Sequence, residues 1–231
     1  MWTGLWRAAV SDLAHLLAVM AGYDERWPLS LADDPRAFSE SLRTDLGATR
    51  VAWLGDWGGN LPMEDGVLEC CRAAFPALES IGCTIEDALP DFDPEALWRA
   101  WLVLRQWLTL GTLGPLYADP AKRTQMKPEA QWEVECGLRL SARDVYQASM
   151  VRSAWYTTVL WLFERFDELL LPSAQVFPFD AGLRWPREIG GVAMDIYHRW
   201  MQVTSWRPWP GCLRSACPSD STRTGCRWAC R

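Results

Sequence analysis

The residues whose types and spacing could support acid–base chemistry are an aspartate and a histidine near the end of the apolar body, Asp195 and His198. In a helix, a spacing of three residues places both side chains on one face, where the carboxylate can orient the imidazole. Hydrolysis by such a pair also needs a nucleophile, and no strained glycine-flanked serine or isolated activated cysteine stands out in the sequence. We therefore favour a hydrogen-bonded structural histidine over a general base at His198.

A second place to seek a site follows an apolar strand predicted at 169–171, where Pro172-Ser173 begins a loop that continues to Gly182. An amphipathic helix that starts at Ser141 leads into this strand, which indicates a sheet covered by helices. In such sheets ligands usually bind beyond the carboxyl ends of the strands. The loop is therefore where we expect a binding site.

A glycine-rich segment, 55–60, lies between a predicted strand and a predicted helix, which is the position of a phosphate-binding loop. Asp56 would repel a phosphate, Trp57 adds bulk, and the segment lacks the Gly-Lys-Ser/Thr pattern. We predict a glycine turn at the strand end, which leaves open a place for Trp57 at the mouth of a pocket.

The eight cysteines form two groups. Compact zinc sites usually begin with two cysteines that are closer in sequence than any two in the tail, and no histidine lies near the tail cysteines. We therefore favour unstructured thiols in the tail over a zinc site or disulfides. The cysteines of the body are typical of small buried side chains in a reducing compartment. The tail group is Cys212, Cys217, Cys226 and Cys230, and the body group is Cys70, Cys71, Cys83 and Cys136.

The composition limits the classes of function. The chain has 231 residues and a formal net charge of −6, which argues against nucleic acid or an anionic membrane surface as a partner. No apolar run approaches the roughly 18 residues that a membrane helix requires, so we expect a cytoplasmic protein. Residues 204–231 contain five arginines, one acidic residue and no valine or isoleucine. We predict an α/β domain over 1–203 and a tail over 204–231 that is disordered or frame-shifted.

Alternation and periodicity predict the elements that position these residues. Strands at 50–54 and 83–88, joined by a helix over 62–80 that Pro76 kinks or ends early, form a parallel crossover unit. Asp93 and Ser141 each begin a later helix, and Gly111 is expected to end the first of them. A helix over 6–21 should bury Val10, Leu13, Leu17 and Met20, and another should span 128–140. The core is expected to contain Trp98, Trp101, Trp107, Trp155 and Trp161.

Three segments, in order, carry a resemblance to a known family. They are 10–14 (V-S-D-L-A), 21–31 with G-Y-D and W-P-L-S, and 166–173 (F-D-E-L-L-L-P-S). Their order and spacing resemble the V-x-D-x-A, G-x-D with D-P-x-S, and F-D-x-L-L-x-P-T segments of the amidase signature family. Trp27 replaces the usual acid, and Ser173 replaces the threonine. The resemblance covers about 7–203 and the C-terminal half of the family.

The resemblance implies an α/β fold, part of a mixed β-sheet flanked by helices, in an α/β/α sandwich that is incomplete here. It also implies hydrolysis of carboxylic amides through an acyl-serine, with a bridging serine and a lysine as activating groups. The sequence has no adjacent serine pair, and neither Lys122 nor Lys127 stands in a matching context. We interpret the chain as an amidase fragment without activity of its own, and we expect no cofactor and no metal.

In the intact family the substrate would be a small-molecule amide, and the retained residues would form a wall of the acyl pocket. One alternative is a non-catalytic interaction module, since an open sheet edge favours homo-oligomerisation or aggregation. Another is a piece of a tRNA-dependent amidotransferase. The candidates for substrate binding are Ser173, Gln175, Phe177, Asp195 and His198.

Overall fold

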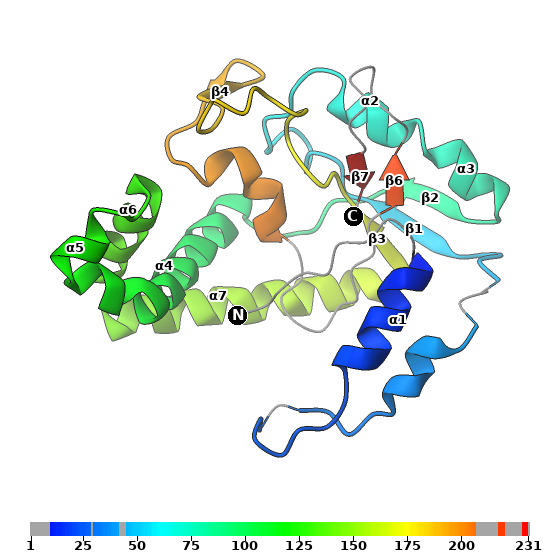
Figure 1. Ribbon diagram of the computed structural model, residues 1–231. Helices are drawn as coiled ribbons and strands as arrows, with labels where there is room; N and C mark the ends of the chain where they lie inside the picture. Colours follow the sequence, from blue (N-terminus) through cyan, green and yellow to red (C-terminus); the bar gives the residue numbers. More distant parts are fainter. Residues whose placement is uncertain (1–9, 29, 42–44, 207–216, 220–227, 231) are drawn as a thin grey trace. The chain divides into compact units, whose positions relative to one another are not determined.

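A computed structural model describes residues 10–28, 30–41, 45–206, 217–219 and 228–230 (Figure 1). These residues belong to two compact units, Met1–Asp45 and Leu46–Arg231, and each unit is considered by itself. None of the helices described is long and apolar enough to cross a membrane.

The first unit contains α1 (Val10–Met20) and the 3-10 helix η1 (Pro35–Ser39), which pack on each other. The predicted buried face of α1 is wrong at both ends, because Val10 and Met20 are 65% and 59% exposed. Only Ala14, in the middle of the helix, is buried. The 3-10 helix η1 has only five residues, so it is too short to cover both end turns of α1.

The second unit is built on a parallel sheet of three strands in the order β2-β1-β3. The central strand β1 (Arg50–Trp53) pairs with β2 (Thr84–Asp87) on one side and with β3 (Glu168–Leu170) on the other. The predicted strands are confirmed to within a residue or two at each end. Because all three strands run in one direction, the segments that follow them meet at one edge of the sheet.

The connection from β1 to β2 contains two helices, α2 (Val67–Arg72) and α3 (Phe75–Ser80), in place of the single helix predicted over 62–80. Pro76 occupies the first turn of α3, where its missing N–H costs nothing, so the expected interruption is confirmed. The helical region starts later than predicted because Gly66, at φ +89°, turns the chain immediately before α2.

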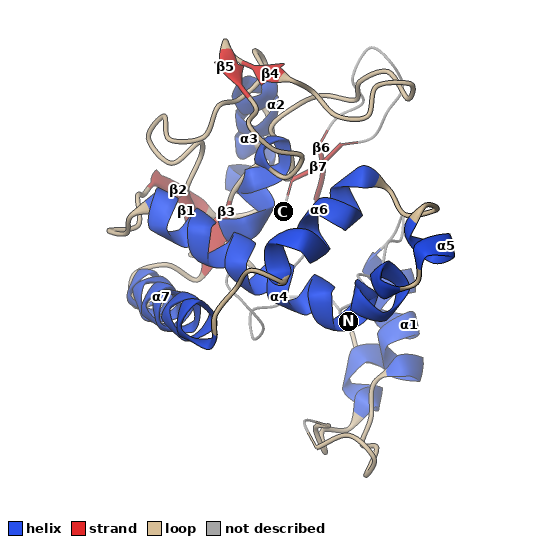
Figure 2. Cartoon of the chain, turned by 90° about the vertical axis from the view of Figure 1, so that its left-hand side faces the viewer, coloured by secondary structure: helices blue, strands red, loops and turns tan. Residues whose placement is uncertain are grey.

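A layer of helices covers the sheet, and α4 packs against both α6 and α7 (Figure 2). The predicted caps are confirmed, since Asp93 accepts from Glu95 N and Ser141 forms a capping box with Asp144. The predicted end at Gly111 is wrong, because packing against two helices outweighs the low helix propensity of glycine. The layer consists of α4 (Pro94–Ala118) and α7 (Ala142–Phe163), and α5 (Pro120–Arg123) and α6 (Pro128–Gly137) pack on α4 away from the sheet.

The main core lies between β1, α4 and α7, and includes Ala52, Leu97 and Trp155. Among the five tryptophans predicted to be core, Trp98 and Trp155 are each 1% exposed. Trp107 and Trp161, by contrast, are 50% and 59% exposed, so the prediction is wrong for these two. They lie on the outer sides of α4 and α7.

After β3 the chain forms a loop, an antiparallel hairpin and a 3-10 helix. The hairpin pairs β4 (Glu188–Ile189) with β5 (Val192–Ala193), and η2 spans Arg199–Trp206. In the tail, β6 (Cys217–Ser219) pairs with β7 (Trp228–Cys230). Residues 204–206 of the predicted tail belong to η2, whereas 207–216, 220–227 and 231, with Cys212 and Cys226, lie outside the described residues.

We expect two glycine-to-alanine substitutions to change stability in opposite directions. A Cβ at Gly137 would lie 2.7 Å from the carbonyl oxygen of Gln106 and 2.8 Å from Cβ of Leu110, so α4 and α6 must separate. Gly137→Ala should therefore lower the free energy of unfolding by about 1–3 kcal/mol. A Cβ at Gly111 would meet nothing within 4 Å. Gly111→Ala should therefore raise the free energy of unfolding by about 0.5–1 kcal/mol. Urea denaturation measures both, and the same sign for both variants would contradict the packing.

Candidate functional site

The carboxyl ends of β1 and β3 lead into two loops, 54–66 and 171–182, and Gln175 joins them. Its side chain is fully buried, and its Nε2 donates to the carbonyl oxygen of Pro62 at 3.0 Å. Its Oε1 accepts from Val203 N in η2, also at 3.0 Å. Both ends of the amide thus bind backbone groups, so Gln175 holds three segments together and leaves no polar end for a ligand.

A second tie between the loops involves Glu64 and Phe177. Glu64 N donates to the carbonyl oxygen of Gln175 at 2.9 Å, and Glu64 Oε2 accepts from Phe177 N at 2.7 Å. The half-buried ring of Phe177 lies against Gly66, where a Cβ would sit 3.5 Å from it. No sequence pattern pointed to Glu64, because its partners lie far along the chain.

Ser173 is the third residue after β3 and is less buried than Pro172 and Gln175. It is half-buried, whereas they are buried. Within the described part of the chain, its hydroxyl has no hydrogen-bond partner. Among the predicted binding residues it is the one whose polar group remains available.

Asp195 and His198 do not form the acid–base pair that their spacing suggested and that the sequence as a whole disfavoured. Residues 195–198 form a turn ahead of η2, so the helical spacing that would align the two side chains does not apply. Asp195 instead binds Arg199 through both carboxylate oxygens, at 3.1 Å each. Burial raises the pKa of Asp195, but the hydrogen bond and charge of Arg199 outweigh it and hold that pKa below its ordinary value.

His198 is 2% exposed, and its Nε2 lies 2.5 Å from Oε1 of Glu133 on α6. Arg105 Nε on α4 donates to the same oxygen at 2.6 Å, and Thr109 Oγ1 donates to Oε2 at 2.9 Å. Burial raises the pKa of Glu133, but the hydrogen bond from His198 and the charge of Arg105 outweigh it and lower the pKa below its ordinary value. The imidazole of His198 is thus buried and held through Nε2, by a partner that no sequence pattern indicated.

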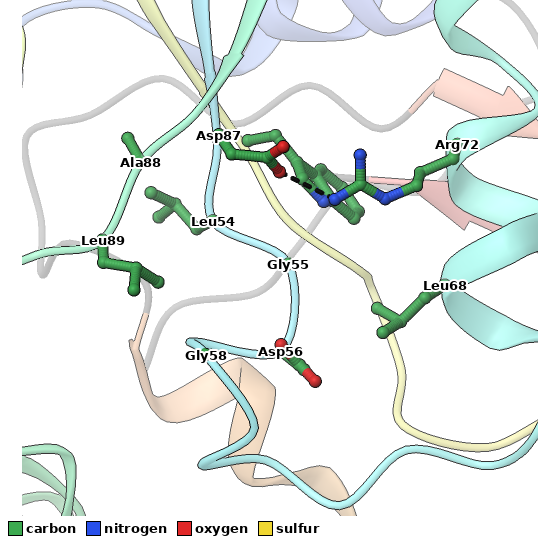
Figure 3. Close-up of a pocket in the computed structure, with 10 residues that line it drawn as sticks. Leu54, Gly55, Asp56, Gly58, Leu68, Arg72, Asp87, Ala88 and Leu89 are labelled. Atoms are coloured by element: carbon green, nitrogen blue, oxygen red, sulfur yellow. Dashed lines mark hydrogen bonds and ion pairs between the residues drawn. The ribbon is translucent and has the colours of Figure 1, made fainter.

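A pocket of about 360 Å³ lies where β1 and β2 end (Figure 3). Arg72 from α2 pairs with Asp87 at 2.7 Å, and Asp56 lies apart from this pair across the pocket. Trp57 does not line it, although the sequence left that place open, because its ring packs 5.1 Å from that of Trp155 in the core. Among the residues that line it, the charged side chains are Asp56, Arg72 and Asp87, and none is a serine, cysteine or histidine.

Comparisons with known proteins agree with this architecture. The chain is similar to a solved bacterial aryl acylamidase of the amidase signature family, with a TM-score of 0.76 and 17% identity over 96% of this chain and 46% of that one. It is 35% identical over 92 residues to an acylamidase of Rhodococcus erythropolis, covering 38% of this chain and 19% of the relative. It is 31% identical over 83 residues to one of the subunits of the glutamyl-tRNA(Gln) amidotransferase of Exiguobacterium sibiricum, covering 36% and 17%.

No family model matches the chain. The chain spans about half the length of the solved structure, and the alignments cover 19% and 17% of the two curated relatives. The predicted α/β class and the resemblance to amidase signature enzymes are nevertheless confirmed, because the fold similarity extends over nearly the whole chain.

The buried amide of Gln175 generates a test. Gln175→Leu keeps the size of the side chain but leaves the buried Val203 N and the part-buried Pro62 O without their partners, which should cost about 2–4 kcal/mol of unfolding free energy. The matched control is Gln125→Leu. The exposed side chain of Gln125 donates to Ala121 O at 3.2 Å, and water can replace that hydrogen bond when the amide is removed. Urea denaturation of both variants measures the difference, and an equally mild effect at Gln175 would show that the loops are held by other contacts.

The depressed pKa of Glu133 predicts how stability depends on pH. A carboxyl group with a lowered folded-state pKa stabilises the fold above its unfolded pKa of about 4.3, and that contribution is lost as pH falls through the folded value. Urea midpoints of the wild type should therefore decrease below about pH 4.5. Glu133→Gln should lose about 2–4 kcal/mol at neutral pH and show a flatter profile in acid. Asp65→Asn, on an exposed loop, should keep the wild-type profile, and a wild-type profile in Glu133→Gln would contradict the assignment.

Proposed function

We propose that this chain, which has the fold of the amidase signature enzymes, supplies a wall of the amide-binding pocket of such a hydrolase and does not hydrolyse amides by itself. The wall consists of the two loops beyond the carboxyl ends of β1 and β3. Ligands of helix-flanked parallel sheets usually bind at this edge. The proposal rests on the joining of these loops by Gln175 and Glu64.

The positions of the lysines support the absence of independent activity. In the family, the resemblance implies a lysine beside a serine pair, but this sequence has no adjacent serines and only two lysines. Lys122 lies in α5, where it pairs with Asp119 at 3.3 Å, and Lys127 is the N-cap residue of α6. Both are exposed, and Figures 1 and 2 place α5 and α6 away from the sheet. Neither can activate a serine at the sheet edge.

We assign different roles to the predicted binding residues. The hydroxyl of Ser173 would hydrogen-bond the amide, and the ring of Phe177 would pack against the apolar part of the substrate. Gln175 would act indirectly, by fixing the loop in place. Asp195 and His198 would anchor the segment behind it, since the carboxylate of Asp195 already binds Arg199 and Nε2 of His198 already binds Glu133.

The substrate class we propose is a small carboxylic amide, in keeping with the names of the acylamidase relatives. The amidotransferase relative keeps the second branch open, in which the chain would belong to a larger assembly. Cys70, Cys83 and Cys136 are free thiols, which is in keeping with a reducing compartment such as the cytoplasm.

The absence of activity is tested on the full chain with an aryl amide such as p-nitroacetanilide. We expect release of the aniline no faster than in buffer, and no incorporation of a fluorophosphonate that labels activated serines. A full-length amidase serves as the positive control for both assays. Turnover that the fluorophosphonate abolishes would refute the proposal.

Binding at the wall is tested separately. In an NMR titration with a small aryl amide, we expect shifts in the amides of 171–177 and 54–66 and none in α5. Ser173→Ala should weaken binding about threefold to tenfold, the worth of one hydrogen bond. Ser80→Ala, at an exposed position on α3, is the control. Shifts confined to other surfaces, or equal binding by the two variants, would remove Ser173 from the site.

A further inference from the structure

The outer face of α7 carries a continuous stripe of exposed residues at spacings of three and four. Such spacings place side chains on one side of a helix. We call this the outer stripe of α7, and its principal members are Arg143, Tyr146, Met150, Thr157, Trp161 and Glu164. The opposite face holds Ala148, Trp155 and Val159, which are buried against α4 and the sheet. Figure 2 shows α7 end-on with α4 on its inner side.

The outer stripe is unusual because it is exposed, apolar and free of charge except at its ends. Tyr146, Met150 and Trp161 are 66%, 54% and 59% exposed. Between residues 145 and 163 the sequence contains one charged residue, Arg152, which is half-buried and lies off the stripe. The water-facing side of a helix normally carries charged side chains. A long uncharged face with large apolar side chains is typical of a surface that another helix covers.

The stripe is also symmetric about its centre. Its midpoint lies between Ser153 and Ala154, two small exposed residues. Tyr146 and Trp161 stand at equal distances on either side of this point, and the basic and acidic ends, Arg143 and Glu164, do so as well. A second identical helix placed antiparallel across the midpoint would bring each residue level with its counterpart.

We propose that α7 pairs antiparallel with α7 of a second copy of this chain, about a two-fold axis between Ser153 and Ala154. The small residues at the axis allow the helices to approach to the usual ~8–10 Å. Tyr146 meets Trp161 of the second copy on both sides of the axis. Arg143 at one end faces Glu164 of the second copy, and the symmetry repeats this ion pair at the other end. The pairing does not depend on the proposed amide site.

Charge exchange at the two ends tests the pairing on the full chain. Sedimentation velocity over a range of concentrations should show a reversible dimer. Arg143→Glu alone, or Glu164→Arg alone, places like charges opposite each other twice and should raise the dissociation constant about tenfold. The double variant R143E/E164R should restore it. Each single change suits the helix dipole, with an acid at the N-terminus and a base at the C-terminus, so the monomer should not unfold.

Matched controls separate this face from the rest of the surface. Arg99→Glu near the start of α4 and Glu79→Arg near the end of α3 make the same charge changes at exposed helix positions off the stripe, and should leave dimerisation unchanged. Ser153→Cys, at the axis, should add under oxidation a disulfide between residues 153 of two copies, which peptide mapping identifies, whereas Ser80→Cys should add no corresponding link at residue 80. A monomer at every concentration would overturn the proposal. So would general aggregation, or self-association whose dissociation constant is the same in the wild type, the single variants and the double variant.

Discussion

One buried amide fixes the geometry on which the candidate site depends. Gln175 binds Pro62 O with its nitrogen and Val203 N with its oxygen, and its own carbonyl accepts from Glu64. Counting Gln175 itself, these groups belong to three segments, the loops after β1 and β3 and the 3-10 helix η2, which the pairing of the strands does not connect. In a buried setting each of these backbone groups needs a partner. The side chain of Gln175 meets that need, and the loops take their positions from it.

The same principle explains the cluster around Glu133. A carboxylate that is 4% exposed is tolerated because Arg105, Thr109 and His198 saturate its two oxygens. These groups come from α4, α6 and the turn ahead of η2, so the cluster fixes the helices relative to that turn. Residues that look reactive in the sequence are thus used to hold the unit together. This is why a histidine and an aspartate three residues apart do not make an acid–base pair here.

The sequence predicted the features that depend on local chemistry. The caps at Asp93 and Ser141, and the break at Pro76, each follow from a few adjacent residues, and the structure confirms them. The continuation of α4 through Gly111 could not be predicted, because it depends on packing against α6 and α7. Likewise, Gln175 and His198 were recognised as notable residues, but their partners lie in segments distant in the sequence. The resemblance supplied the fold, which local periodicity alone leaves open.

The two faces of α7 place different demands on one helix. Its inner face buries Trp155 and Val159 in the core, and this burial accounts for the stability of the helix in the monomer. Its outer face contributes nothing to that core, yet it keeps Trp161, Met150 and Tyr146 where charged residues would serve solubility better. Folding of the unit alone gives no physical reason for such a face. Since Arg143 and Glu164 complement each other only across a two-fold axis, association with a second copy explains both the missing charges and the position of those that remain.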